Sequence, residues 1–286
     1  MLVNSKRMLN KARDLNYAVP AADVFNLESL KGVLNAAKEC DSPLIIALAE
    51  VHEETLPLKE CALLVKYFAE NMEQDIVLHL DHGFTPSLVK EAVDCGFTSV
   101  MFDGSSLPYD ENVRVTKEIV EYAKKHDVTV EAEIGHVGSG AAGASSEVKE
   151  SAGEDTTELT TVEEAAAFAE ATGVDSLAVS IGTAHGNYVG TPKLDFERLK
   201  DIRANIKIPL VLHGGSGTGY ENLNKAVSLG ISKVNIYTDL MNAAKDAYEK
   251  EIENMDYFEL CAVSQKAVTE KLKEYYEVFM TKKSRE

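Results

Sequence analysis

The sequence predicts a (β/α)8 barrel, the TIM-barrel fold, with a pair of helices appended at its C-terminal end. The 286 residues alternate eight short, β-branched apolar segments with longer amphipathic segments. Several of the short segments are apolar at consecutive positions, as is typical of parallel strands covered on both faces. An open doubly wound sheet is the alternative, but the G-x-G-x-x-G motif that usually follows its first strand is absent. The barrel is therefore favoured.

The elements follow in order along the chain. The predicted strands are residues 17–21, 44–49, 76–80, 99–102, 129–134, 176–181, 208–212 and 233–236. The predicted helices include residues 57–71, 86–95, 112–126, 161–172 and 220–229. Glycine directly follows three of these helices, at Gly96, Gly173 and Gly230, where a left-handed residue commonly ends a helix. Residues 239–255 and 258–281 form the appended pair, and we expect residues 1–286 to make one domain.

One connection is much longer than the others. Residues 135–160, between the fifth predicted strand and its helix, are rich in Gly, Ala, Ser and acidic residues. A long connection in a compact domain is usually functional or disordered, and in a barrel this one lies at the catalytic face. We interpret it as a lid, with a disordered insertion as the alternative.

Composition restricts the partners. The chain has 29 Lys and Arg against 47 Asp and Glu, a formal net charge of −18. This acidity argues against nucleic-acid binding and against docking on anionic membranes. The four cysteines form no disulfide or metal-binding pattern, the N-terminus has no apolar signal segment, and no apolar run approaches the roughly 18 residues of a membrane span. We expect a cytoplasmic protein.

Three of the seven histidines follow predicted strands: His82, His185 and His213. The carboxyl ends of barrel strands meet at one mouth, and three imidazoles with an open fourth position are typical of catalytic zinc. A single histidine at a strand end is more often a packed residue, but three such histidines favour a metal site. Acidic residues lie at matching places, namely Asp81, Asp103 and Glu133. His79 lies inside its strand and is interpreted as a packing or supporting residue.

Glycines adjoin these histidines. Gly83, Gly186 and Gly214 each follow a histidine directly, and residues 214–217 form a Gly-Gly-Ser-Gly loop after the seventh strand. Glycine allows tight turns and close approach to a ligand, and phosphate sites in barrels lie after strands seven and eight. Glycine used only for tight turns is the alternative.

Six segments together resemble a known family. They are LHLDHG at 78–83, VMFDGS at 100–105, VEAE at 130–133, IGTAHGNY at 181–188, LHGGSG at 212–217 and KVNIYTDL at 233–240. In this order they resemble the signature motifs of the class II, zinc-dependent ketose-bisphosphate aldolases, which include the fructose- and tagatose-bisphosphate enzymes. The resemblance extends over essentially the whole chain.

The resemblance implies roles for individual residues. It implies that His82, His185 and His213 bind zinc and that Asp81 transfers a proton beside the metal. Asp103 and Glu133 match acids at an alternative or second metal position, which a second divalent or a monovalent cation would occupy. The residues that match the cradle of the dihydroxyacetone phosphate half are Gly186, Gly214, Gly215, Ser216, Asn235 and Thr238.

The sequence also departs from the family pattern. The usual lid glutamate is replaced by Ala141, with Glu147 as a candidate substitute. At the far end of the substrate pocket, the residues that differ are Asp23, Ala49, Val189, Tyr237 and Met241. Met241 stands where related enzymes carry Arg, and Val189 stands where they often carry Lys. The resemblance thus implies an intact metal end and an altered far end, with Asp23 and Tyr237 among the substrate-binding residues.

We therefore predict a zinc-dependent aldolase that cleaves a ketose 1-phosphate reversibly to dihydroxyacetone phosphate and an aldehyde. The C6 group is predicted not to be phosphate, with 6-sulfofructose 1-phosphate as an example. The alternatives are a fructose- or tagatose-1,6-bisphosphate aldolase proper and a non-catalytic sugar-phosphate-binding barrel. A zinc hydrolase is disfavoured because no early His-x-His pair is present. Aromatic residues in the appended helices favour a homodimer or homotetramer, although such faces are more often core: Tyr257, Phe258, Tyr275, Tyr276 and Phe279.

Overall fold

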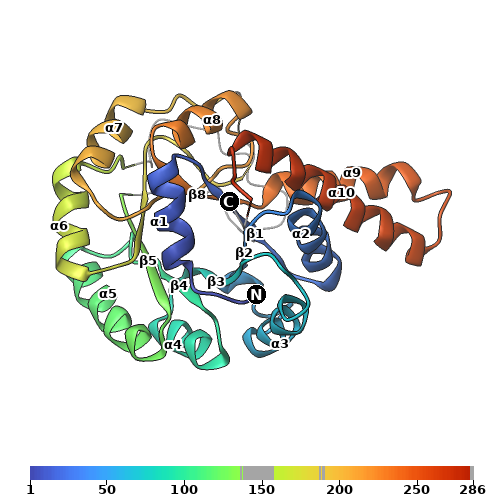
Figure 1. Cartoon of the computed structure of the whole chain (residues 1–286), viewed down its shortest axis with the longest axis horizontal. Coiled ribbons are helices and arrows are strands. Elements are labelled where there is room, and N and C mark those ends of the chain that lie inside the picture. The colour runs from blue at the N-terminus through green and yellow to red at the C-terminus, as the bar shows by residue number, and fades with distance from the viewer. Residues whose placement is uncertain (136, 138–157, 187, 189–190, 284–286) are drawn as a thin grey trace.

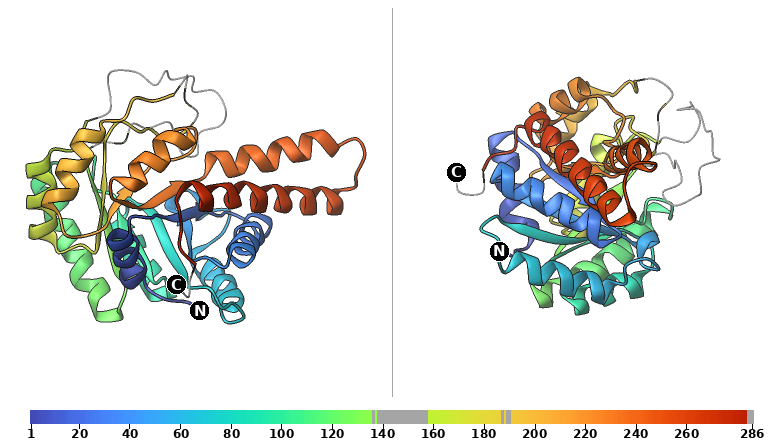
Figure 2. Two further views of the ribbon diagram at one scale, coloured as in Figure 1. Left: turned by 45° about the horizontal axis from the view of Figure 1, so that its top comes forward. Right: turned by 90° about the vertical axis from the view of Figure 1, so that its right-hand side faces the viewer.

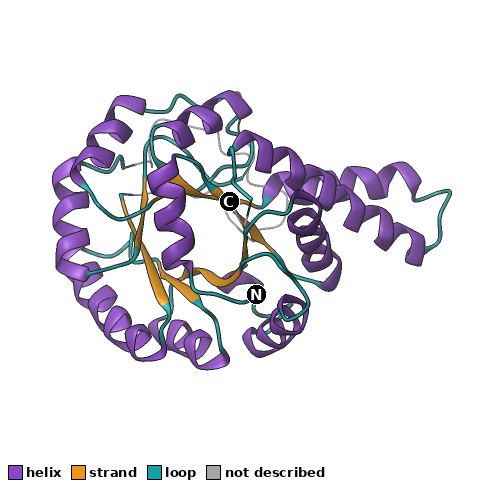
Figure 3. Ribbon diagram, in the orientation of Figure 1, coloured by secondary structure: helices purple, strands orange, loops and turns teal. Residues whose placement is uncertain are grey.

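The computed structural model describes residues 1–135, 137, 158–186, 188 and 191–283, and it contains a closed barrel of eight parallel strands (Figures 1 and 3). Each strand pairs with the next in sequence, and β8 pairs with β1. The strands are β1 (Val19–Asp23), β2 (Leu44–Ala49), β3 (Ile76–Gly83), β4 (Ser99–Phe102), β5 (Thr129–Ile134), β6 (Ser176–Val179), β7 (Leu210–Leu212) and β8 (Ile231–Ile236). The predicted barrel is confirmed.

Helices surround the barrel, as the alternation predicted (Figure 3). They are α2 (Leu27–Cys40), α3 (Leu58–Ala69), α4 (Pro86–Cys95), α5 (Tyr109–Ala123), α6 (Val162–Thr172), α7 (Phe196–Asn205) and α8 (Tyr220–Ser228). Short 3₁₀ turns follow β2 (Glu50–His52) and α5 (Lys124–His126). Gly96 and Gly173 end α4 and α6 in the left-handed conformation, as predicted.

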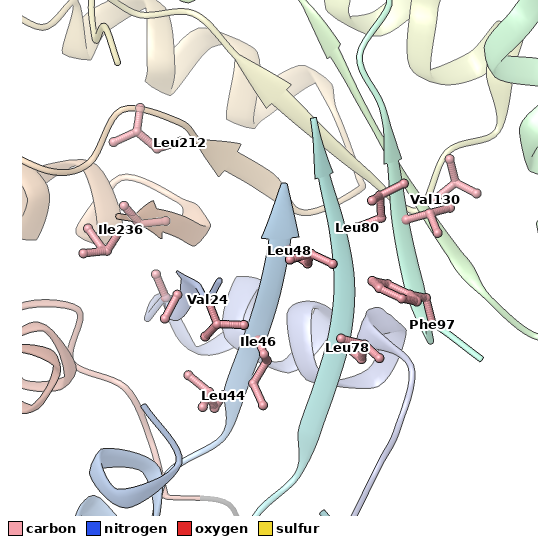
Figure 4. Packing of buried hydrophobic residues seen from close by; sticks show 14 of the residues in the cluster. Val24, Leu44, Ile46, Leu48, Leu78, Leu80, Phe97, Val130, Leu212 and Ile236 are labelled. Carbon is pink, nitrogen blue, oxygen red and sulfur yellow. The ribbon is translucent and has the colours of Figure 1, made fainter. Parts of the chain in front are cut away.

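The apolar core lies mainly between the strands and the surrounding helices. Alternate strand residues such as Ile46, Leu78 and Val130 point outward into this layer (Figure 4). The same alternation directs Glu131 and Glu133 to the barrel interior, because side chains of neighbouring strand residues point to opposite faces. The interior of this barrel is therefore partly charged.

The helix α1 (Ser5–Leu15), which the sequence analysis did not name, closes one end of the barrel (Figure 1). Its Met8, Leu9 and Ala12 pack in a separate apolar cluster with strand residues that include Val19 and Val77. Both of these lie near the amino ends of their strands. The carboxyl ends are consequently the open mouth.

The C-terminal pair, α9 (Thr238–Glu251) and α10 (Tyr257–Val278), projects beyond the barrel as an arm (Figure 2). The pair itself is confirmed. Its aromatic residues divide into two sets: Tyr275, Tyr276 and Phe279 belong to the core, whereas Tyr257 and Phe258 are 73% and 82% exposed. Among the described helices, none is both long and apolar enough to cross a bilayer.

Candidate metal centre

Three histidines from three strands meet at the mouth. His82 lies in β3, His185 follows β6, and His213 directly follows β7. Nε2 of His82 lies 3.1 Å from Nε2 of His185 and 2.8 Å from Nδ1 of His213. Zinc–nitrogen bonds of about 2.0–2.1 Å in a tetrahedron place neighbouring nitrogens about 3.3 Å apart. The spacing therefore suits one zinc ion.

The backbone of β3 turns His82 toward this point. His82 has a φ of 43°, in the left-handed region that non-glycine residues rarely adopt. The pairing of β3 with β4 shifts register between Leu80 and Gly83. A Cβ at Gly83 would lie 2.6 Å from the carbonyl oxygen of Met101, so glycine is required there. Backbone strain of this kind persists where the surrounding structure imposes it, often at functional sites.

The loop carrying His185 is tied to the loop after β7. The hydroxyl of Tyr188 donates to the carbonyl oxygens of Ala184 at 2.7 Å and Gly214 at 3.1 Å. Gly214 has a φ of 67°, and a Cβ there would lie 2.3 Å from the Ala184 carbonyl oxygen. Close packing of the two loops thus fixes the separation of His185 and His213.

Asp103, which follows β4, orients His82. Its Oδ2 accepts a hydrogen bond of 2.8 Å from Nδ1 of His82, so Nε2 remains for a metal. Burial lowers the pKa of His82, but the negative charges of Asp81 and Asp103 outweigh it and raise that pKa to about 10. This arrangement fits a supporting role for Asp103 beside its predicted metal-binding role.

Glu133 carries a buried oxygen without a partner. Its Oε2 has no hydrogen bond and lies 3.7 Å from Nδ1 of His213. Burial, followed by the charge of Asp103, raises its pKa to about 8. An unpaired buried carboxylate is costly unless a cation is bound nearby. Glu133 can also group with His82 and Asp103 around a cation, so the residues present fit the predicted zinc and a second metal position.

A buried ion pair supports His213 from inside the barrel. Nε2 of His213 donates to Oε1 of Glu131 at 3.0 Å, and Nζ of Lys233 donates to both Glu131 oxygens at 2.7 and 2.8 Å. Lys233 also donates to His79 at 3.1 Å, and His79 contacts the hydroxyl of Ser99 at 2.8 Å. The hydrogen bond from Nε2 of His213 to Glu131 orients the ring so that Nδ1 faces the predicted metal position. Sequence reasoning assigned no role to Glu131 or Lys233, although charged residues inside apolar strands were a usable signal.

Asp81 lies beside the metal position. Its Oδ2 lies 3.9 Å from Nε2 of His82, and its Oδ1 accepts a hydrogen bond of 2.8 Å from Asn235. Burial raises the pKa of Asp81, but the positive charges of His82 and His213 outweigh it and lower that pKa to about 2. A carboxylate held ionised next to a Lewis acid can accept a proton from a bound hydroxyl group.

The predicted phosphate cradle lies where β7 and β8 end. Oγ of Ser216 accepts from the backbone N–H groups of Tyr237 at 3.3 Å and Asp239 at 3.1 Å. This contact brings the glycine loop 214–217 to the N-terminus of α9, where Thr238 is the first residue. A Cβ at Gly215 would lie 2.7 Å from the Asn235 carbonyl oxygen. Backbone N–H groups of glycine turns and helix N-termini favour anions, and Gly186 with its φ of 93° belongs to the adjacent loop.

The other side of the mouth, after β8, β1 and β2, is built differently. The rings of Phe25, His52 and Tyr237 form an aromatic wall, with ring centroids 5.0 to 6.4 Å apart. Asp23 ends β1, is only 4% exposed, and has no partner for Oδ1. Burial, followed by the charge of Asp81, raises the pKa of Asp23 well above its ordinary value. Partial burial, followed by the charge of Asp23, raises the pKa of the half-buried Tyr237.

The lid assigned to residues 135–160 lies largely outside the described residues, as do Ala141, Glu147 and Val189. Both ends of that connection are anchored. Oγ1 of Thr160 donates to the Ile134 carbonyl at 2.7 Å and accepts from the Ser180 N–H at 2.8 Å. Gly135 adopts a φ of 74° and a Cβ there would clash with Thr160.

Comparison with known proteins gives consistent results. Residues 3–284 match the family model of fructose-bisphosphate aldolase class II. The YdjI aldolase from Escherichia coli K12 is 33% identical, with 98% of each chain covered and a TM-score of 0.87. A protein from Coccidioides immitis provisionally described as a fructose-1,6-bisphosphate aldolase is 30% identical, with 98% of this chain and 97% of that chain covered and a TM-score of 0.86. The fructose-bisphosphate aldolase of Campylobacter jejuni, at 23% identity, 99% and 96% coverage and a TM-score of 0.83, shows the same fold.

Proposed function

The chain belongs to the class II fructose-bisphosphate aldolase family, and we propose that it cleaves a ketose 1-phosphate whose C6 group is not a phosphate. The products are dihydroxyacetone phosphate and an aldehyde, and the reaction is reversible. The observation that carries the proposal is the meeting of ring nitrogens of His82, His185 and His213 at one point, with the carboxylate of Asp81 3.9 Å from His82.

When bound, zinc supplies a Lewis acid that polarises the C2 carbonyl of the substrate. His82, His185 and His213 would hold it. Asp81 takes the proton from the C4 hydroxyl, which becomes the aldehyde as the C3–C4 bond breaks. The electron pair stays on C3 of the three-carbon half, which must then take a proton. We propose Glu147 of the lid for this step because the usual lid glutamate is Ala141 in this chain.

The phosphate at C1 binds to the glycine loop, to the N-terminus of α9 and to the side chains of Ser216, Asn235 and Thr238. Backbone N–H groups supply the main attraction. This mode of binding is compatible with a chain whose net charge is −18.

The far end of the substrate pocket lacks, at two positions, the cations that normally bind a second phosphate. Met241 and Val189 stand where related enzymes place Arg and Lys, and Tyr237 adds bulk. Charge-assisted bonds from Arg are the usual means of holding a phosphate. A sulfonate, as in 6-sulfofructose 1-phosphate, carries one negative charge instead of nearly two and is one group that could replace it.

We also propose that the protein is cytoplasmic and forms a homodimer or homotetramer. The projecting arm supports the assembly, since its exposed Tyr257 and Phe258 are large aromatic side chains of the kind enriched at interfaces. Size-exclusion chromatography with light scattering tests this, and a monomer at micromolar concentration would contradict it.

The decisive experiment incubates zinc-loaded protein with ketose 1-phosphates that differ only at C6 and measures the release of dihydroxyacetone phosphate. Release that depends on zinc supports the aldolase. A tenfold or greater advantage in kcat/KM for fructose 1,6-bisphosphate, about 1.4 kcal/mol in transition-state binding, would instead favour a bisphosphate aldolase proper. Binding of these sugars without any release would favour the non-catalytic barrel.

A further inference from the structure

Buried polar atoms without partners mark a second half of the ligand site. Seven buried side-chain N or O atoms in the described part of the chain lack a hydrogen bond, and five of these lie at the barrel mouth. Two belong to Glu133 and Thr183, on the metal side. Of the other three, Oδ1 of Asn235 belongs to the predicted phosphate cradle, whereas Oδ1 of Asp23 lies at the end of β1 and Nδ1 of His52 just after the neighbouring strand β2. Such atoms are costly when unpaired, so they point to a ligand that pairs with them.

The proposed orientation of the bound substrate places its carbons beyond C4 next to the unpartnered atoms of Asp23 and His52. Asp81 acts at C4 and has His82 and the metal on one side. On the other side, Ala49 of β2 pairs in register with Asp81, and β1, which ends in Asp23, pairs with β2. Carbons beyond C4 that continue away from the metal therefore pass over the small side chain of Ala49 toward Asp23.

The side of the mouth formed by the loops after β8, β1 and β2, which we call the far sector, carries charges unsuited to binding an anion. The described loops after β8, β1 and β2, namely residues 237, 24–26 and 50–57, contain no lysine or arginine. They contain Glu50, Glu53 and Glu54 in addition to the nearby Asp23 and Asp81. An anionic group would lose its hydration here without gaining a cation from these loops.

Two lysines outside these loops already have carboxylate partners. The buried Lys233, whose charge acts on Asp23, is paired with Glu131, and Lys245 is paired with Glu249. Lys245 lines a cavity of about 430 Å³ that shares Phe25 and Tyr237 with the aromatic wall but is otherwise formed by α2, α9 and α10. Its ammonium lies 3.4 Å from Glu249 and its side chain is 69% exposed. Neither Asp23 nor His52 lines that cavity.

We propose that Asp23, His52 and the aromatic wall form the specificity subsite for the far end of the substrate, and that this end is an uncharged, hydroxylated chain. This inference rests on the proposed function and narrows it. A hydroxyl group can donate to Oδ1 of Asp23 and pair with Nδ1 of His52, which satisfies both unpartnered atoms. A phosphate or sulfonate can accept at most one proton from a carboxyl group and leaves the far sector without a counter-charge. Sites built to hydrogen-bond a hydroxyl discriminate strongly by this means.

The test compares three ketose 1-phosphates with zinc-loaded enzyme: fructose 1-phosphate, with a C6 hydroxyl, fructose 1,6-bisphosphate, and the 6-sulfo analogue. We expect kcat/KM for the hydroxyl sugar to exceed that for each anionic sugar at least tenfold. The Asp23→Asn variant should narrow this gap at least tenfold, chiefly by raising kcat/KM for the bisphosphate. Glu60→Gln is the matched control, since it removes an exposed carboxylate from α3, outside these loops, and should leave the preference unchanged.

The outcomes separate the two proposals. If none of the sugars releases dihydroxyacetone phosphate, the proposed function fails and this inference fails with it. If release occurs but either anionic sugar equals or exceeds the hydroxyl sugar, the uncharged far end alone is overturned. This wild-type comparison stands even if Asp23→Asn does not fold. If the folded, zinc-containing variant keeps the wild-type preference, Asp23 is not part of the subsite.

Discussion

The two sides of the barrel mouth differ in how their polar atoms are satisfied. On the metal side, Asp103 holds His82 and the Glu131–Lys233 pair holds His213, and the unpartnered oxygen of Glu133 lies 3.7 Å from Nδ1 of His213, where a cation would pair with it. On the far side, Asp23 and His52 each keep a buried polar atom without a partner. This difference is what we expect if one side is pre-organised for a bound metal ion and the polar atoms of the other side find their partners only in a bound substrate.

The largest expected effect is at the metal. His185→Ala should abolish tight zinc binding and lower kcat/KM by about 10⁴-fold or more, because two ligands cannot replace a three-histidine site. Metal content by mass spectrometry and turnover measure this. His126→Ala is the matched control, since His126 is exposed at the end of a 3₁₀ turn that precedes β5, at the end of the barrel opposite the mouth. Full zinc occupancy and normal cleavage in His185→Ala would end the three-histidine assignment.

Asp81 lies between the two sides, so its substitution tests chemistry apart from metal binding. Asp81→Asn keeps an oxygen that can accept from Asn235 and should leave folding and zinc intact. Turnover should fall by roughly 10²–10⁴, the usual contribution of general acid–base catalysis. Asp201→Asn, on the exposed face of α7, provides the control. Loss of zinc with the fold intact would make Asp81 a ligand, and unchanged turnover would remove it from the mechanism.

A smaller effect is expected one contact further from the metal. Lys233→Met leaves Glu131 buried without its cation, which should destabilise the fold by about 3–5 kcal/mol. Zinc affinity, measured by competition with a chelator, should fall about 10–100-fold because His213 loses its orientation. Lys200→Met, at an exposed ion pair, should change neither quantity.

A double variant separates the two consequences of that change. Lys233→Met with Glu131→Leu removes both buried charges and should recover much of the stability, since an apolar pair can replace a buried ion pair. It should not recover zinc affinity, because Nε2 of His213 then lacks its acceptor, Glu131. Recovery of both would show that Glu131 and Lys233 serve the fold alone.

The same contrast explains what the sequence could predict. The eight strands and the three histidines predicted to bind zinc are local signals: apolar runs bounded by turns, and histidine followed by glycine at strand ends. The boundary of β1 was wrong by two residues at each end, since 17–21 was predicted and Val19–Asp23 is observed. Tyr17 is apolar and buried because α1 packs on it, not because it is a strand residue.

Other features depend on contacts between distant residues and could not be read from one segment. Lys233 meets Glu131 across the barrel interior, 102 positions away in sequence, so neither residue signals its partner locally. The absence of partners at Asp23 and His52 is likewise visible only after the fold brings β8, β1 and β2 together. The motifs predicted an altered far end, and the proposed subsite at Asp23 and His52 rests on three-dimensional packing that no single motif shows.

The smallest expected effect is a gain in stability on the far side, whereas Lys233→Met on the metal side is expected to lose stability. His52→Phe keeps a ring in the aromatic wall and removes a buried nitrogen that has no partner, so it should stabilise the fold by about 1 kcal/mol. For a chain of this size that corresponds to a rise in Tm of about 2–4 °C. At the same time KM for the hydroxyl sugar should rise with little change in kcat, since a binding contact far from the reacting carbons is lost. His79→Phe is the contrasting variant, because both nitrogens of His79 are paired, with Ser99 and Lys233, and its loss should destabilise. Urea unfolding of the two variants decides the matter: equal destabilisation by both would mean that His52 is as well satisfied as His79 and that the two sides of the mouth do not differ.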